Sequence, residues 1–210
     1  MSDDHCCDPV FLDGPDAAAA AGRLGVLGFV ALWGGQRPAV ASLCDDPTVV
    51  EAQKHAGRLE VDDAGLLVGV HGLVARTTRH RIDHPAGAVH TWCALDAIGI
   101  PAALAIDATA VTSCPTCDVE LRVELCQGEP VDTEEPLRLW LPEGICDHLV
   151  EDFCDHANLY CSPEHLSATV PKGSPGRIAT VADAVAIGRQ TWDDAAAALG
   201  DEGSGVHDGR

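Results

Sequence analysis

The segment LEVDDAGLLVGV, residues 59–70, is typical of a β-hairpin and decides the fold predicted for the first third of the chain. Two short apolar runs, 59–61 and 66–70, flank the sequence Asp-Asp-Ala-Gly, whose composition favours a tight turn. Three helices are predicted before this hairpin, at residues 16–33, 38–43 and 46–56, from their apolar runs and from the Pro, Asp and Gly residues at their ends. Three helices followed by a hairpin predict a winged-helix-like domain over residues 16–82, with a second strand pair at about 73–82.

After Pro85 the pattern changes to short strands and isolated helices. Residues 90–99 predict a helix with Thr91 near its N-cap and Gly99 and Pro101 at its end. The sequence predicts strands at 110–113, 119–125, 137–141 and 158–160, a helix or loop at 145–154, and an alanine-rich terminal helix at 180–199. The predicted class is therefore α+β. An N-terminal winged-helix-like three-helix/β-hairpin part packs on a mixed α/β part, residues 83–200, with short antiparallel sheets, and residues 1–15 and 201–210 are flexible ends.

The charge of the chain argues against a nucleic-acid or membrane surface. The 210 residues carry a formal net charge of −20, whereas phosphate groups are bound by positive surfaces. The predicted helix at 46–56 is a poor DNA probe, because its only lysine, Lys54, is outnumbered by acidic residues. The longest apolar run is interrupted by Arg23 and by glycines, and the acidic start of the chain lacks the basic residues of a secretory signal. We therefore expect a cytoplasmic protein.

Cysteine is the unusual residue of this composition. Cytosolic thiols stay reduced, so that ten cysteines favour metal or thiolate chemistry over a disulfide scaffold. They are Cys6, Cys7, Cys44, Cys93, Cys114, Cys117, Cys126, Cys146, Cys154 and Cys161.

Cys93 and Asp96 are the first candidate pair, because a spacing of three places both side chains on one face of the predicted helix. In the first helical turn we expect the pKa of Cys93 to be lowered by the helix N-terminus. A neighbouring thiolate and partial burial should raise the pKa of Asp96. A soft metal ligand beside a proton carrier suits the cleavage of a metal–carbon bond. The spacing alone favours a simpler interpretation, a buried cysteine next to an aspartate on the helix surface.

Three segments carry a resemblance to a known family. HTWCALD at 90–96, followed by GIPA at 99–102, resembles the segment that holds the first catalytic cysteine and the aspartate of organomercurial (alkylmercury) lyases. DFCDH at 152–156 is similar to the segment of the second catalytic cysteine, and TSCP at 112–115 to that of a further, structural cysteine. The resemblance covers about residues 16 to 200. It implies Cys93, Asp96 and Cys154 as catalytic residues, with Cys93 and Cys154 as ligands of the substrate and product mercury.

The resemblance also implies an activity. Organomercurial lyases break the carbon–mercury bond by protonolysis, releasing a hydrocarbon and Hg(II), in mercury detoxification. Small organomercurials would be the substrates, no cofactor would be needed, and cellular thiols or a mercuric reductase would accept the Hg(II). We expect a monomer or homodimer. One alternative is a non-catalytic, thiol-rich mercury-binding or metal-sensing winged-helix protein, and another is a relative that has lost the activity or cleaves a different metal–carbon bond.

Additional thiols leave open questions around this assignment. Cys161 follows Cys154 by only seven residues and competes with it as second ligand, although the Phe-Cys-x-His context favours Cys154. Cys114 and Cys117 have the spacing of a zinc knuckle, which Cys146 and His148, or Cys154 and His156, would complete. A structural zinc at Cys114 and Cys117 is a possible but not the favoured interpretation, and His148, His156 and His165 are expected to be surface or hydrogen-bonding groups. Cys6 and Cys7 either relay a soft metal or have no function.

Overall fold

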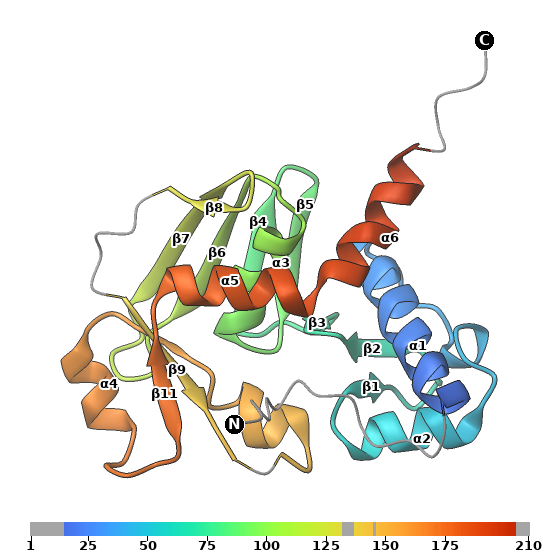
Figure 1. Ribbon diagram of the computed structural model, residues 1–210, viewed down its shortest axis with the longest axis horizontal. Coiled ribbons are helices and arrows are strands. Elements are labelled where there is room, and N and C mark those ends of the chain that lie inside the picture. Colours follow the sequence, from blue (N-terminus) through green and yellow to red (C-terminus); the bar gives the residue numbers. More distant parts are fainter. Residues whose placement is uncertain (1–14, 132–136, 145, 205–210) are drawn as a thin grey trace.

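Two antiparallel sheets, surrounded by helices, make up the computed structural model, which describes residues 15–131, 137–144 and 146–204 (Figure 1). The helices are α1 Pro15–Trp33, the 3-10 helix η1 Val40–Ser42, α2 Pro47–His55, α3 Ala94–Ala103, the π-helix η2 Val150–Cys154, α4 Pro163–Thr169, α5 Val181–Thr191 and α6 Asp193–Ser204. The strands are β1 Leu59–Val61, β2 Leu67–Val70, β3 Leu73–Val74, β4 Arg81–His84, β5 Gly87–Thr91, β6 Ala108–Ser113, β7 Glu120–Cys126, β8 Glu129–Pro130, β9 Arg138–Pro142, β10 Leu159–Tyr160 and β11 Gly176–Ala179. The predicted α+β class with antiparallel sheets is confirmed.

The helices and hairpin of the N-terminal part lie close to their predicted positions. Asp46 caps α2 by accepting hydrogen bonds from the backbone N–H groups of Thr48 and Val49. The prediction of a helix at 38–43 is wrong beyond one short turn, because the backbone around Ala39 pairs with Leu66 of the hairpin instead. The hairpin itself is confirmed, since β1 and β2 pair antiparallel around the predicted turn.

The larger sheet has eight strands in the order β1-β2-β3-β5-β4-β6-β7-β8, and the smaller one has the order β10-β9-β11. The predicted strand pair at 73–82 is wrong in its pairing. β3 pairs with β5, and β4 lies between β5 and β6. The hairpin thus forms one end of a sheet that continues through residues 82 and 83. In β7, side chains alternate between buried and exposed, as its sequence pattern predicts.

The helix at the centre of the molecule, α3, begins later than predicted. The chain stays extended through Thr91 in β5, so that Cys93 rather than Thr91 is the N-cap residue. Gly99 and Pro101 lie inside the helix instead of ending it. Gly99 has a packing role, because it meets Gly188 of α5 so closely that a Cβ on either residue would clash with the other helix. The glycines therefore allow α3 and α5 to cross in close contact over the sheet.

The predicted terminal helix at 180–199 is wrong as a single element. It is divided into α5 and α6 at Trp192, whose Nε1 donates a hydrogen bond to the carbonyl oxygen of His71 at 2.8 Å. The Trp192 ring is buried and lies against α3, while α6 runs beside α1 (Figure 1). The C-terminal helices thereby pack against both α3 and α1.

Helix α1, with 19 residues, is long and apolar enough to cross a membrane by length and composition. Helices in the core of a folded domain meet the same criterion. Leu24, Gly28, Phe29 and Leu32 of α1 are buried, and the helix packs against α2, α6, β2 and β3.

Candidate active site

Cys93, Asp96 and Cys154 come together in the interior although they lie far apart in sequence. Their ligand atoms all lie within 4.8 Å of one another, and all three residues are buried. Cys93 stands at the junction of β5 and α3, Asp96 in the first turn of α3, and Cys154 at the end of η2. The segment after η2 is tied to the start of α3, because the N–H of Ala94 donates to the carbonyl oxygen of Ala157 at 3.1 Å. The three residues predicted from sequence thus form one group.

The carboxylate of Asp96 is fixed by the backbone of the helix that carries it. Oδ2 accepts a hydrogen bond from the N–H of Cys93 at 2.8 Å. Burial raises the pKa of Asp96 to about 7, even though its hydrogen bonds to Cys93 act in the opposite direction. The predicted direction of this shift is confirmed, but its main cause is burial rather than a neighbouring thiolate. A carboxyl group with this pKa both accepts and donates a proton near neutrality.

Cys93 differs from its prediction. Complete burial raises the pKa of its thiol, and the charge of Asp96 adds to this effect, while a hydrogen bond with Cys154 lowers the pKa. The position at the helix N-terminus was expected to lower it, but removal from water has the larger effect. Cys93 is therefore a thiol that carries a proton, placed directly beside a group that can take it.

A cavity of about 530 Å³ adjoins this group. Asp96 and Cys154 contribute to its lining, whereas Cys93 does not. Much of the wall is apolar, including Trp92, Phe153 and Trp192. Trp92 is at once a core and a cavity residue. A small apolar ligand entering this cavity would meet Cys154 before Cys93.

The neighbouring thiols form a separate group. Cys161 lies with Cys114, Cys117 and His165, so the geometry selects Cys154 over Cys161 as the partner of Cys93. The residues predicted to complete a site with Cys114 and Cys117 are wrong. Cys154 lies in the group with Cys93, and the ring of His148 is packed against Gly57. Cys6 and Cys7 fall outside the described residues.

Sequence reasoning missed two features of this arrangement. Trp192 carries no motif, and only the fold places it at the cavity. Cys161 and His165, by contrast, are only four residues apart in the sequence, a signal that was available beside the Cys114–Cys117 pair.

Comparison with known proteins places this geometry in a family. The family described as alkylmercury lyase matches residues 73–193, more than half of the chain and all three residues of the buried group. The chain belongs to the alkylmercury lyase family. The family resemblance inferred from Cys93, Asp96 and Cys154 is thereby confirmed.

Curated relatives and a solved structure agree with this assignment. The alkylmercury lyase of Pseudomonas putida is 29% identical over 147 residues, covering 68% of this chain and 62% of the relative. That of Streptomyces lividans is 25% identical over 134 residues, covering 62% of this chain and 61% of the relative. The matches thus span less than two thirds of either alkylmercury lyase. The crystal structure of a mercury-bound form of MerB2 has the same fold, with a TM-score of 0.72 at 17% identity over 84% of this chain and 91% of that structure.

Proposed function

We propose that this alkylmercury lyase family member cleaves the carbon–mercury bond of small organomercurials by protonolysis. The observation that carries the proposal is the buried group itself. Two thiols and a carboxyl group with a pKa of about 7 lie within 4.8 Å, beside a largely apolar cavity. Thiolates are the ligands that a soft metal ion prefers, and the carboxyl group is matched to proton transfer near neutral pH.

Capture of the substrate begins at Cys154, because this thiol lines the cavity and Cys93 lies behind it. An organomercurial, carried as R–Hg–SR′ by a small cellular thiol, exchanges its thiolate for that of Cys154. The small thiol leaves as R′SH with the Cys154 proton, and the product is Cys154–S–Hg–R. The apolar side chains of Phe153 and Trp192 then surround the organic group R.

Protonolysis follows within the group. Asp96 takes the proton of the Cys93 thiol, and the resulting thiolate becomes the second sulfur ligand of mercury. Donation from two thiolates increases the electron density on the bound carbon. The carboxylic acid of Asp96 then protonates this carbon, the Hg–C bond breaks, and R–H leaves. Hg(II) remains bound by Cys93 and Cys154, and Asp96 is again a carboxylate.

Release of Hg(II) requires two external thiols, which return one proton to each cysteine. We propose cellular thiols or a mercuric reductase as acceptors, in a cytoplasmic detoxification route. These reaction steps need no organic cofactor, since the protein and the substrate supply every reacting group. We further propose that residues 16–82 act as a winged-helix-like structural part without a DNA-binding role, which the acidic surroundings of α2 support.

The test is hydrocarbon release from methylmercury or phenylmercury in the presence of excess small thiol. Asp96→Asn preserves the acceptor for the Cys93 N–H but removes the proton carrier. We expect it to retain mercury binding and to lose about 100-fold or more in turnover. Asp155→Asn is the matched control, since this exposed carboxylate lies next to Cys154 in sequence and should leave turnover unchanged.

Two results would count against the proposal. Tight mercury binding without methane or benzene release by the wild-type protein would indicate a non-catalytic, thiol-rich mercury-binding protein. Equal turnover of wild type and Asp96→Asn would remove Asp96 from the mechanism while leaving the lyase activity in place.

A further inference from the structure

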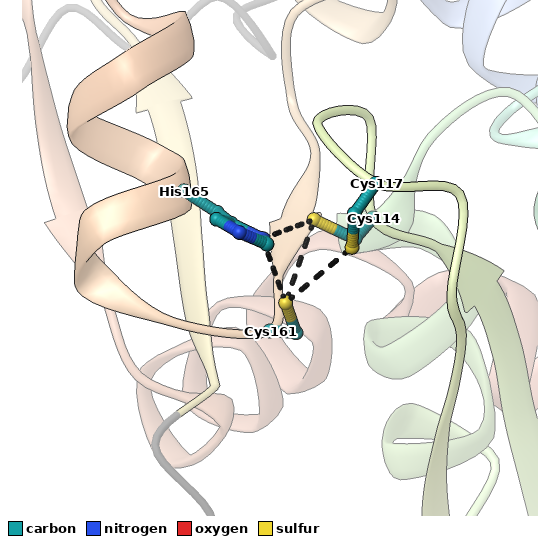
Figure 2. Close-up of side chains that lie close together, drawn as sticks. All are labelled: Cys114, Cys117, Cys161 and His165. Atoms are coloured by element: carbon teal, nitrogen blue, oxygen red, sulfur yellow. Dashed lines mark hydrogen bonds between the residues drawn. The ribbon is translucent and has the colours of Figure 1, made fainter.

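A second sulfur group lies apart from the buried catalytic group, at the surface of the molecule. Cys114, Cys117, Cys161 and His165 direct three sulfurs and one imidazole nitrogen toward a common point (Figure 2). Sγ of Cys161 lies 3.7 Å from Sγ of Cys114 and 3.8 Å from Sγ of Cys117. Nδ1 of His165 lies 3.7 Å from Sγ of Cys114 and 3.0 Å from Sγ of Cys161.

These distances are those of a tetrahedral metal site. Zn–S bonds of about 2.3 Å at tetrahedral angles place two sulfurs about 3.8 Å apart, and a sulfur and an imidazole nitrogen about 3.5 Å apart. Bonded disulfide sulfurs, at about 2.05 Å, are far closer than any sulfur pair here. Cys161 stands near the ideal separation from both other thiols, so that small side-chain adjustments complete the tetrahedron.

We propose that Cys114, Cys117, Cys161 and His165 bind a structural Zn²⁺ ion. Three thiolates and one imidazole form a closed Cys₃His ligand set, the type that zinc adopts in structural sites. Four protein ligands leave no coordination position for water or substrate. The ion therefore does not contact the substrate, and the zinc proposal stands independently of the proposed function.

The backbone around the ligands is arranged to hold them. Cys114 and Cys117 lie in a tight turn between β6 and β7, closed by hydrogen bonds from Asp118 N–H to the Cys114 carbonyl oxygen and from Cys114 N–H to that of Val119. Such a knuckle turn directs two side chains to one side of the chain. Ser162 caps α4 by accepting a hydrogen bond from the N–H of His165 at 3.3 Å.

A further polar contact joins the two halves of the site. Thr116, between the first two cysteines, donates to the carbonyl oxygen of His165 at 3.0 Å and bonds to the hydroxyl of Thr169 at 2.7 Å. Contacts outside the ligands that fix their orientation are typical of metal sites. Protein contacts alone therefore hold the two ligand-bearing segments together.

The position of the site in the fold suggests a structural role for the ion. The site joins the β6–β7 turn of the eight-stranded sheet to the segment that runs from the end of β10, in the small sheet, into α4. That segment follows Cys154 by seven residues, whereas Cys93 belongs to the large-sheet side. Zinc at this junction would hold the two catalytic cysteines at a fixed separation without contacting either.

The experiment measures zinc in the full chain purified under reducing conditions, after loading with Zn²⁺ and dialysis against a weak chelator. We expect one zinc per wild-type chain. Cys117→Ser and His165→Ala should retain at least about 10-fold less zinc per chain than wild type. Loss of a ligand weakens metal binding more than loss of a contact outside the ligands does. Cys126→Ser and His156→Ala are the matched controls, exposed residues of the same types outside the group, and should retain one zinc.

Two additional measurements make the result specific. Cobalt(II) substituted into wild type should give the sulfur-to-cobalt charge-transfer absorption of a tetrahedral thiolate site, and Cys117→Ser should lose intensity. The double variant Cys93→Ser/Cys154→Ser should still hold one zinc. A wild-type chain that retains no zinc, or a double variant that loses it while Cys117→Ser keeps it, would overturn the proposal.

Discussion

The two sulfur groups of this protein differ in ligand number, burial and access. The proposed catalytic group has two thiols and one carboxyl group, all buried, and it borders a cavity of about 530 Å³. The surface group has three thiols and an imidazole, with Cys117 exposed and only Cys114 buried. The first set leaves room for a substrate carbon and supplies a proton, whereas the second fills a tetrahedron with protein ligands.

This difference shows that cysteine-rich sequence is not one kind of site. Both groups draw on residues distant in sequence, and the segment from Cys154 to Cys161 contributes to each. What separates their chemistry is the group that accompanies the thiols. In the proposed mechanism Asp96, kept protonatable by burial, permits bond cleavage, whereas in the proposed zinc site His165 completes the ligand set. Exchange of a residue in one group should therefore leave the signature of the other group intact.

The largest expected effect tests this separation directly. Cys154→Ser removes the thiol that lines the cavity and should reduce turnover by about 100-fold or more, because a hydroxyl group is a poor ligand for a soft metal. Cys161→Ser should leave turnover within about 10-fold of wild type but abolish stoichiometric zinc binding. The measurements are hydrocarbon release and metal content on the same preparations. If Cys161→Ser lost turnover and Cys154→Ser did not, the assignment of the second mercury ligand would be reversed.

The next effect concerns the wall of the catalytic cavity. Trp192→Ala should lower the free energy of unfolding by about 3–5 kcal/mol, since it empties a buried space between α3 and the His71 backbone. Trp192→Phe keeps most of the volume and should cost less. Chemical denaturation of both variants gives the values. Equal stability of Trp192→Ala and wild type would show that the ring does not support the core.

The sequence allowed the selection of Cys93, Asp96 and Cys154, which the structure brings together, and of most strands, because each depends on a local pattern or on a family segment. It did not allow prediction of the Cys93 pKa, since the helix N-terminus is visible in sequence and the extent of burial is not. The start of α3 was misplaced because pairing with β3 and β4 keeps His90 and Thr91 extended. The break between α5 and α6 falls at Trp192, whose indole N–H bonds to His71, 121 positions away, a contact that no local pattern reveals.

The pH dependence of stability should reveal the unusual state of Asp96. Its pKa is about 7 in the folded protein and about 3.9 in the unfolded chain, so the folded state holds an extra proton between these values. Stability contributed by this group is therefore full below about pH 4 and is lost as pH rises through 7. Asp96→Asn lacks this loss, and its stability relative to wild type should rise by up to about 4 kcal/mol between pH 4 and pH 8.

Asp183 provides the matched comparison for this titration. A hydrogen bond from the Thr180 N–H lowers the pKa of its carboxyl group, so its stabilising effect is present at neutral pH and lost on acidification. Asp183→Asn should therefore lose stability relative to wild type as pH rises toward about 4, a slope opposite in sign to that of Asp96→Asn and in a lower pH window. Denaturant titrations from about pH 2 to pH 8 cover both windows and measure both slopes. Parallel slopes for the two variants would mean that burial does not control the protonation of Asp96.

The smallest expected effect concerns the link between the cavity wall and the protein surface. Trp92 donates a hydrogen bond from Nε1 to Glu60 at 2.7 Å, and Arg76 pairs with the same carboxylate at 3.0 Å. Glu60→Ala leaves a buried indole N–H without this acceptor and should cost about 1–3 kcal/mol. Arg76→Ala removes only an exposed partner and should cost less than about 1 kcal/mol. Chemical denaturation of the two variants measures both losses in the free energy of unfolding. A larger loss for Arg76→Ala would place the stabilisation in the surface ion pair, and an effect of Glu60→Ala on zinc content would contradict the independence of the two sulfur groups.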